Sequence, residues 1–150
     1  MEINGVAHTF ITAGDFERSV AFYRQLLPYL GLQEVADSED TYYCVGGRTG
    51  FGIRRPDPQY VTARFKQYRV GLHHHCWRAR ERRDVDELFI FLLAIGAKIV
   101  HGPQEDSFAP GYYSVLFEDP DGIRLELNHV PGRGLFDTAT QRVGASLDDR

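Results

Sequence analysis

The chain has 150 residues with a formal net charge of -4, and 43% of its residues are hydrophobic, 13% aromatic and 25% charged. This length and composition are typical of one compact globular domain, or of two small modules that share a core. The acidic balance gives no electrostatic reason to bind nucleic acid or a membrane surface, so we expect neither as a partner.

Cysteine content and the N-terminal sequence favour a cytoplasmic location. Cys44 and Cys76 are the only cysteines, which is too few for a secreted disulfide scaffold. The opening MEINGVAHTF lacks the basic region followed by a long apolar stretch that a signal peptide requires. The most apolar stretch, LFIFLLAIGA, is too short to span a bilayer.

The first half of the chain predicts a strand, a helix and three further strands. GVAHTFIT is a β-branched and aromatic run typical of a strand, and Asp15 is a candidate N-cap for the helix that follows. Gly31 stands where a C-terminal glycine belongs. LQEVADSED, TYYCVGG and GFGIRRP then predict three strands. The apolar residues of the predicted helix recur at helical spacing: Phe16, Val20, Tyr23, Leu27 and Leu30.

The second half repeats this order. GLHHHCWRA predicts a strand, RRDVDELFIFLLAIGA a helix that Gly96 closes, and AKIVHGP another strand. YYSVLFEDPDGIRLELNHV predicts a hairpin whose turn, Pro120-Asp121-Gly122, has proline and glycine at the positions that favour them.

The two halves align, which predicts a duplicated βαβββ module. Val20 aligns with Val85 and Gly31 with Gly96, and His8 aligns with His74 when one more loop residue is allowed. The alternative is two unrelated α+β halves. We expect a first module at residues 1–56, a linker at 57–70, a second module at 71–131 and a loosely held C-terminal extension at 132–150.

The triple histidine of GLHHHCW contains one candidate metal ligand. Side chains alternate along a strand, so His74 shares a face with Cys76, whereas His73 and His75 share the opposite face. Because the repeat aligns His74 with His8, these two histidines are the candidate ligands, and we expect His73 and His75 to be structural. A strand histidine by itself is more often a hydrogen-bonded core or surface residue than a ligand.

Glu126 is the natural third ligand. It lies between two leucines in IRLELN, so its side chain faces away from the apolar side of the strand, and a buried carboxylate is costly without a partner. Two histidines and a carboxylate leave open positions on a divalent metal for water or substrate. The alternative is an ordinary half-exposed strand. His101 and His129 are interpreted as surface or loop residues.

Three segments, AHTFITAGDFERSVAFY, GLHHHCWRA and FEDPDGIRLELNHVPG, resemble the glyoxalase / bleomycin-resistance / extradiol-dioxygenase superfamily, also called the vicinal oxygen chelate superfamily. The resemblance covers roughly residues 3 to 131. It implies an α+β fold in which paired βαβββ modules form an open, curved, mixed sheet around a metal-binding cavity, with helices on the outside. It also implies one divalent metal ion (Zn, Ni, Mn, Fe or Co) held by His8, His74 and Glu126, to which the substrate binds through two neighbouring oxygens.

Departures from the family's motifs narrow the range of reactions that this chain is expected to catalyse. The fourth ligand of glyoxalase I-type enzymes would fall at about Gly52, which has no ligating side chain. Leu116 stands where ring-cleaving dioxygenases and fosfomycin-modifying thiol transferases have a tyrosine ten residues before the glutamate. The dioxygenases' upstream histidine is missing from Ser107-Phe108-Ala109, and Phe10 replaces the transferases' threonine. The triad argues against the metal-free, bleomycin-sequestering role.

The resemblance and these departures together predict a metal-dependent lyase or isomerase of the glyoxalase type. Glu126 then has a second, catalytic role as a base that loosens from the metal. The alternatives are a non-haem iron dioxygenase with an unusual second shell and a small-molecule binding or resistance protein. We expect a homodimer acting on a small oxygen-rich molecule. The residues expected to shape the substrate pocket are Phe10, Cys76, Ser114, Leu116 and Arg124.

Overall fold

A computed structural model describes residues 1–132, so nearly all of the predicted C-terminal extension lies outside the described residues. The chain divides into two compact units. Unit 1 comprises Met1–Lys66 together with Asp119–Gly122, and unit 2 comprises Gln67–Glu118 and the chain from Ile123 onward. The module boundaries predicted from the sequence stay a prediction.

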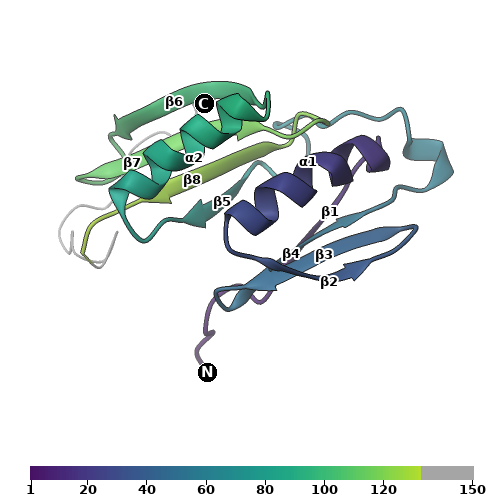
Figure 1. Cartoon of the computed structure of the whole chain (residues 1–150), viewed down its shortest axis with the longest axis horizontal. Helices are drawn as coiled ribbons and strands as arrows, with labels where there is room; N and C mark the ends of the chain where they lie inside the picture. The colour runs from purple at the N-terminus through teal and green to yellow at the C-terminus, as the bar shows by residue number, and fades with distance from the viewer. Residues whose placement is uncertain (133–150) are drawn as a thin grey trace. The chain divides into compact units, whose positions relative to one another are not determined.

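Unit 1 contains one helix and a four-stranded mixed sheet (Figure 1). The strand order is β1-β4-β3-β2, in which β1 and β4 are parallel and the other neighbours are antiparallel. The predicted linker contains a short 3-10 helix at Pro58–Tyr60. The elements are β1 (Thr9–Thr12), α1 (Phe16–Tyr29), β2 (Gln33–Asp37), β3 (Thr41–Gly46) and β4 (Thr49–Arg54).

Unit 2 repeats this topology. Its strand order is β5-β8-β7-β6, with β5 parallel to β8 and the remaining pairs antiparallel. The prediction of a duplicated βαβββ module in an α+β fold is therefore confirmed, and both sheets are open. The elements are β5 (His75–Arg78), α2 (Arg82–Ala94), β6 (Lys98–Asp106), β7 (Tyr112–Glu118) and β8 (Arg124–His129).

The predicted N-cap of the first helix and the predicted glycines after both helices are found in the structure. The Asp15 carboxylate accepts a hydrogen bond from the backbone nitrogen of Arg18 at 3.1 Å, which makes Asp15 the N-cap of α1. Gly31 and Gly96 follow the two helices with φ values of 81° and 70°, a left-handed conformation that glycine adopts without strain. The sequence therefore sets the length of each crossover helix.

The core of unit 2 lies between α2 and one face of its sheet. Val85, Leu88 and Leu92 of α2 are almost completely buried, as are Val115 and Leu125 of the sheet. Because side chains alternate along a strand, the residues between these, including Glu126, occupy the opposite face. Within residues 1–132 neither helix is long and apolar enough to cross a membrane.

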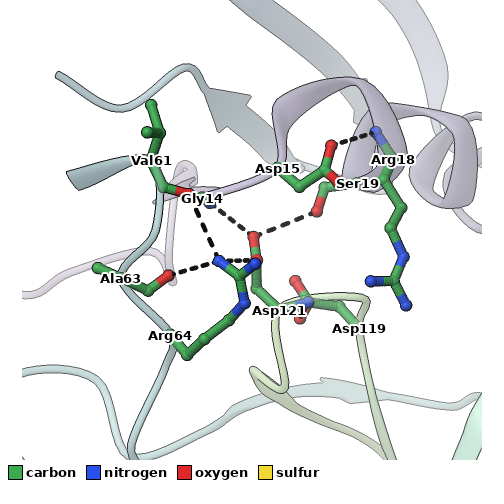
Figure 2. Close-up of polar contacts among 9 residues, drawn as sticks. All are labelled: Gly14, Asp15, Arg18, Ser19, Val61, Ala63, Arg64, Asp119 and Asp121. Atoms are coloured by element: carbon green, nitrogen blue, oxygen red, sulfur yellow. Dashed lines mark hydrogen bonds and ion pairs between the residues drawn. The ribbon is translucent and has the colours of Figure 1, made fainter. Parts of the chain in front are cut away.

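The turn that leads into β8 is anchored by two buried carboxylates (Figure 2). Gly122 donates its backbone N–H to the Asp119 carbonyl at 3.0 Å, which closes the predicted turn. The Asp121 carboxylate accepts hydrogen bonds from the Gly14 backbone nitrogen at 2.7 Å and the Ser19 hydroxyl at 3.3 Å. Asp119 accepts from the Tyr23 hydroxyl at 2.9 Å. All of these residues belong to unit 1, which gives the acidic FEDPDG segment a structural role.

Gly46→Ala is expected to destabilise unit 1 by about 1–3 kcal/mol, because overpacking a close contact costs that much. A Cβ at position 46 would lie 2.7 Å from the Gly31 carbonyl oxygen and 3.1 Å from the Leu32 Cα, and backbone atoms cannot rotate away. Urea unfolding monitored by circular dichroism measures the change. Gly102→Ala is the matched control, because its Cβ would meet only the Phe89 ring at 3.5 Å. Equal midpoints for both variants would contradict the prediction.

Candidate metal-binding site

Glu126 is a buried carboxylate on the sheet face opposite α2. Its side chain is 1% exposed, and its backbone pairs with Cys76 on β5 and Leu116 on β7. Cross-strand partners share a face, so Cys76 and Leu116 flank the carboxylate. A carboxylate this deeply buried requires a compensating partner.

Tyr112 supplies one partner of Glu126. Its hydroxyl donates to Glu126 Oε1 at 2.7 Å and accepts a hydrogen bond from Asn128 Nδ2 at 2.8 Å. Burial raises the pKa of Tyr112, and the hydrogen bond to Glu126 raises it further. Tyr112 therefore remains a protonated donor to the carboxylate at neutral pH.

His74 supplies the second partner. Its Nε2 lies 3.7 Å from Glu126 Oε2, and its side chain is 37% exposed. The other ring nitrogen, Nδ1, lies 2.7 Å from Nδ1 of His73. The predicted strand at residues 71–79 is shorter in the structure, since β5 begins at His75. His73 and His74 thus lie in the segment that leads into the strand, where alternation does not separate their side chains.

The pair of His74 and Glu126 fits two positions around a divalent cation. Zinc binds imidazole nitrogen and carboxylate oxygen at about 2.1 Å, so two such ligands at a tetrahedral angle are roughly 3.4 Å apart. The 3.7 Å between Nε2 and Oε2 is close to this separation. Among residues 1–132, no group of three or more His, Cys, Asp or Glu side chains is arranged to hold a metal ion. The fit therefore concerns two ligands, both in unit 2.

His8, the remaining predicted ligand, belongs to unit 1 and lies immediately before β1. It is exposed, and its ring stands edge-on to Phe10 and to Tyr43, with centroid distances of 5.6 and 6.5 Å. Its role as a metal ligand stays a prediction.

Phe10 lies over Gly52, the position at which the sequence predicts that no fourth metal ligand is present. Phe10 pairs with Gly52 across β1 and β4, and a Cβ at Gly52 would overlap the Phe10 ring. The Phe10 ring stacks on Tyr43 at a centroid distance of 5.0 Å and remains 43% exposed. The missing side chain at Gly52 thus allows two aromatic rings to lie against the sheet beside His8.

The other predicted pocket residues are held by protein contacts. The Ser114 hydroxyl donates to Asp106 at 3.0 Å, and Arg124 Nε lies 3.0 Å from Glu118 Oε1. Cys76 donates its thiol to the Trp77 carbonyl at 3.4 Å, and Leu116 is 3% exposed. Both Ser114 and Arg124 share the face of Glu126 by strand alternation. Their part in binding a substrate stays a prediction.

His75 and His101 make contacts with other residues of unit 2. His75 pairs with Leu125 on the helix-covered face, and its ring lies 4.5 Å from that of Trp77. Burial lowers the pKa of His75 to about 4, with a further contribution from His74. His101 contacts the Gly102 carbonyl through Nδ1 at 2.9 Å. His75 is therefore neutral at physiological pH, which suits a packing role.

The sequence interpretation did not identify Tyr112 or His73 as part of the site. A signal for Tyr112 existed, because it has the same strand parity as Ser114 and Leu116 and so shares their face. Its fourteen-residue separation from Glu126 belongs to no motif considered above. For His73 the sequence offered no signal, since the contact depends on where β5 begins.

Comparison with known proteins places the chain in a family. The sequence profile of the Glyoxalase/Bleomycin resistance protein/Dioxygenase superfamily matches residues 5–127. The uncharacterized protein YqjT of Bacillus subtilis (strain 168) is 27% identical over 128 residues, covering 80% of this chain and 94% of YqjT. The metallothiol transferase FosB of Shouchella clausii (strain KSM-K16) is 25% identical over 126 residues, covering 84% of this chain and 80% of FosB.

Solved structures share the fold. A protein from Bacillus halodurans, provisionally described as a glyoxalase, superimposes with a TM-score of 0.75 at 28% identity, covering 84% of this chain and 96% of that one. With the profile matching most of its length, the chain belongs to the glyoxalase / bleomycin resistance protein / dioxygenase superfamily.

Proposed function

We propose that the protein is a divalent-metal-dependent lyase or isomerase of the glyoxalase type, acting on a small oxygen-rich substrate bound through neighbouring oxygens. The observation that carries this proposal is the buried Glu126 carboxylate, whose Oε2 lies 3.7 Å from Nε2 of His74. His8 would supply the third ligand. The likeness to the Bacillus halodurans protein described as a glyoxalase supports the reaction class.

Glu126 would act as the base in this reaction. A divalent cation at the site would bind two neighbouring substrate oxygens and stabilise negative charge that develops on them. The Glu126 carboxylate would take the proton from the carbon beside the carbonyl, and could return it to the neighbouring carbon to complete an isomerisation. Its burial, at 1% exposure, keeps bulk water from competing for that proton.

Phe10 and Tyr43 would receive the part of the substrate that does not chelate. Their stacked rings lie beside His8, and Phe10 remains 43% exposed. An apolar or aromatic substituent gains most from such a surface, because burying apolar area is favourable and flat groups stack on aromatic rings. A small oxygenated molecule with an apolar end is therefore the proposed substrate class.

The same proposal includes a homodimer in the cytoplasm, and a metal that is zinc, nickel, manganese, iron or cobalt. An imidazole and carboxylate donor set suits several of these ions. An iron-dependent oxygenase would instead consume oxygen during turnover, and a binding protein would retain its ligand after chelator treatment. Thiol transfer, the activity named for FosB, is disfavoured because Phe10 and Leu116 replace the threonine and tyrosine expected of such enzymes.

His74→Ala is expected to lower metal affinity by more than about 100-fold, because even the loss of an outer-shell partner costs 10- to 100-fold. Elemental analysis after dialysis against each candidate metal measures the bound ion. His129→Ala is the matched control, since His129 lies on β8 but pairs with Tyr113 on the helix-covered face. Turnover is then assayed with hemithioacetals of 2-oxoaldehydes, with and without chelator. Unchanged metal content in His74→Ala would show that the ligand is misassigned.

A further inference from the structure

We propose that His73 and Tyr112 orient the two ligand side chains of unit 2, so that Nε2 of His74 and Oε2 of Glu126 are the atoms that bind the metal. This inference rests on the metal site of the proposed function, but not on the reaction. It follows from a continuous series of polar contacts in unit 2. In order, the residues are Gln67, His73, His74, Glu126, Tyr112 and Asn128.

His73 determines which nitrogen of His74 carries the proton. The two Nδ1 atoms lie 2.7 Å apart, so one must donate and the other accept. The amide nitrogen of Gln67 lies 3.3 Å from Nδ1 of His73, and an amide nitrogen is only a donor. His73 Nδ1 is therefore assigned as the acceptor and His74 Nδ1 as the donor, with the two donors sharing the single lone pair of His73 Nδ1 and His74 making the shorter of the two contacts. A neutral His74 ring then has its lone pair on Nε2, the nitrogen that faces Glu126.

His73 is itself held in place. Its ring stands edge-on to Tyr68 at a centroid distance of 5.5 Å, in addition to the contact with Gln67. Metal-binding histidines commonly donate their second ring nitrogen to a fixed acceptor, which sets both the tautomer and the ring orientation. The held ring of His73 can therefore serve as a fixed acceptor for His74 Nδ1.

Tyr112 distinguishes the two carboxylate oxygens of Glu126, because its hydroxyl donates to Oε1. Asn128 Nδ2 donates to the Tyr112 hydroxyl oxygen at 2.8 Å, which leaves the hydroxyl proton for Glu126 Oε1 at 2.7 Å. Oε1 is thereby held by tyrosine, whereas Oε2 lies on the side of His74. Glu126 is thus arranged to bind a metal through one oxygen rather than through both.

The proposal is tested first with Tyr112→Phe, which keeps the ring and removes only the hydroxyl. We expect its affinity for cobalt(II), measured by competition with a chromophoric chelator, to fall about 10- to 100-fold. The visible absorption of bound cobalt(II) should also weaken. Without the tyrosine hydroxyl, Oε1 could bind the metal as an additional ligand, and a higher coordination number lowers the absorptivity of cobalt(II). Tyr113→Phe is the matched control: it removes a neighbouring hydroxyl that donates to Asp86 at 2.6 Å. Thermal unfolding of the metal-free variants checks that each is folded.

The second test compares His73→Leu with His73→Asn. Asparagine offers a polar atom near the position of Nδ1, so we expect His73→Asn to retain cobalt affinity while His73→Leu loses about 10-fold or more. Equal affinities and spectra for wild type, Tyr112→Phe and His73→Leu would overturn the proposal and leave the proposed reaction standing. A wild-type protein that binds cobalt with these variant effects, yet turns over no substrate, would support the proposal and refute the proposed reaction.

Discussion

Glu126→Gln is expected to lower turnover by at least about 10³-fold, since a positioned general base contributes roughly 10²- to 10⁴-fold and a ligand is weakened at the same time. The amide has nearly the shape of the carboxylate, so the change removes charge and basicity with little effect on packing. Glu126 is 1% exposed and accepts a hydrogen bond from Tyr112 at 2.7 Å, an interaction that the amide oxygen can retain. Steady-state kinetics and elemental analysis of the same preparation separate the loss of proton transfer from the loss of metal.

Glu118→Gln is the matched control for this substitution. Glu118 is another buried carboxylate of the same hairpin, at 8% exposure, and it lies 2.7 Å from Lys98 Nζ and 3.0 Å from Arg124 Nε. Its replacement is expected to reduce stability, because it leaves two cations with a weakened partner, while metal content stays unchanged. If Glu126→Gln kept full activity, Glu126 would not be the base.

The architecture could be predicted because its signals are local and repeated. Asp15 caps the first helix, and Gly31 and Gly96 end the two helices in a conformation that favours glycine. Each of these signals needs only a few neighbouring residues. The alignment of the two halves then extended them to a duplicated βαβββ topology, which the strand orders confirm.

The contacts within the site were less predictable, because they depend on where a strand begins and on side-chain direction. The sequence predicts a strand that starts at residue 71, in which the side chains of His73 and His74 would point to opposite faces. In the structure β5 begins at His75, so these two side chains contact each other instead. Tyr112 contacts Glu126 diagonally across β7 and β8, four residues along the strand from the directly paired Leu116. Periodicity gives the face of a residue, but not how far its side chain reaches along that face.

Asp121→Ala is expected to reduce the free energy of unfolding by about 2–5 kcal/mol, the largest stability change predicted for this chain. The Gly14 N–H and the Ser19 hydroxyl would both lose their carboxylate acceptor, and leaving a buried polar group unsatisfied costs roughly 1–3 kcal/mol. Ser19 is fully buried, so water cannot readily replace the lost oxygen. The ion pair with Arg64, at 3.9 Å, adds little because the arginine is 55% exposed.

Asp15→Ala is the control for the change in unfolding free energy of Asp121→Ala, because it also removes a carboxylate near the start of α1 (Figure 2). Asp15 is exposed and its cap on Arg18 is worth about 1 kcal/mol, so its urea midpoint should shift much less than that of Asp121→Ala. Asp121→Asn keeps one acceptor oxygen and should fall between the two. If Asp121→Ala cost no more than Asp15→Ala, the turn would be held by its proline and glycine alone. A larger cost means that the buried carboxylate anchors the turn, because Asp15→Ala leaves that turn and its hydrogen bonds intact.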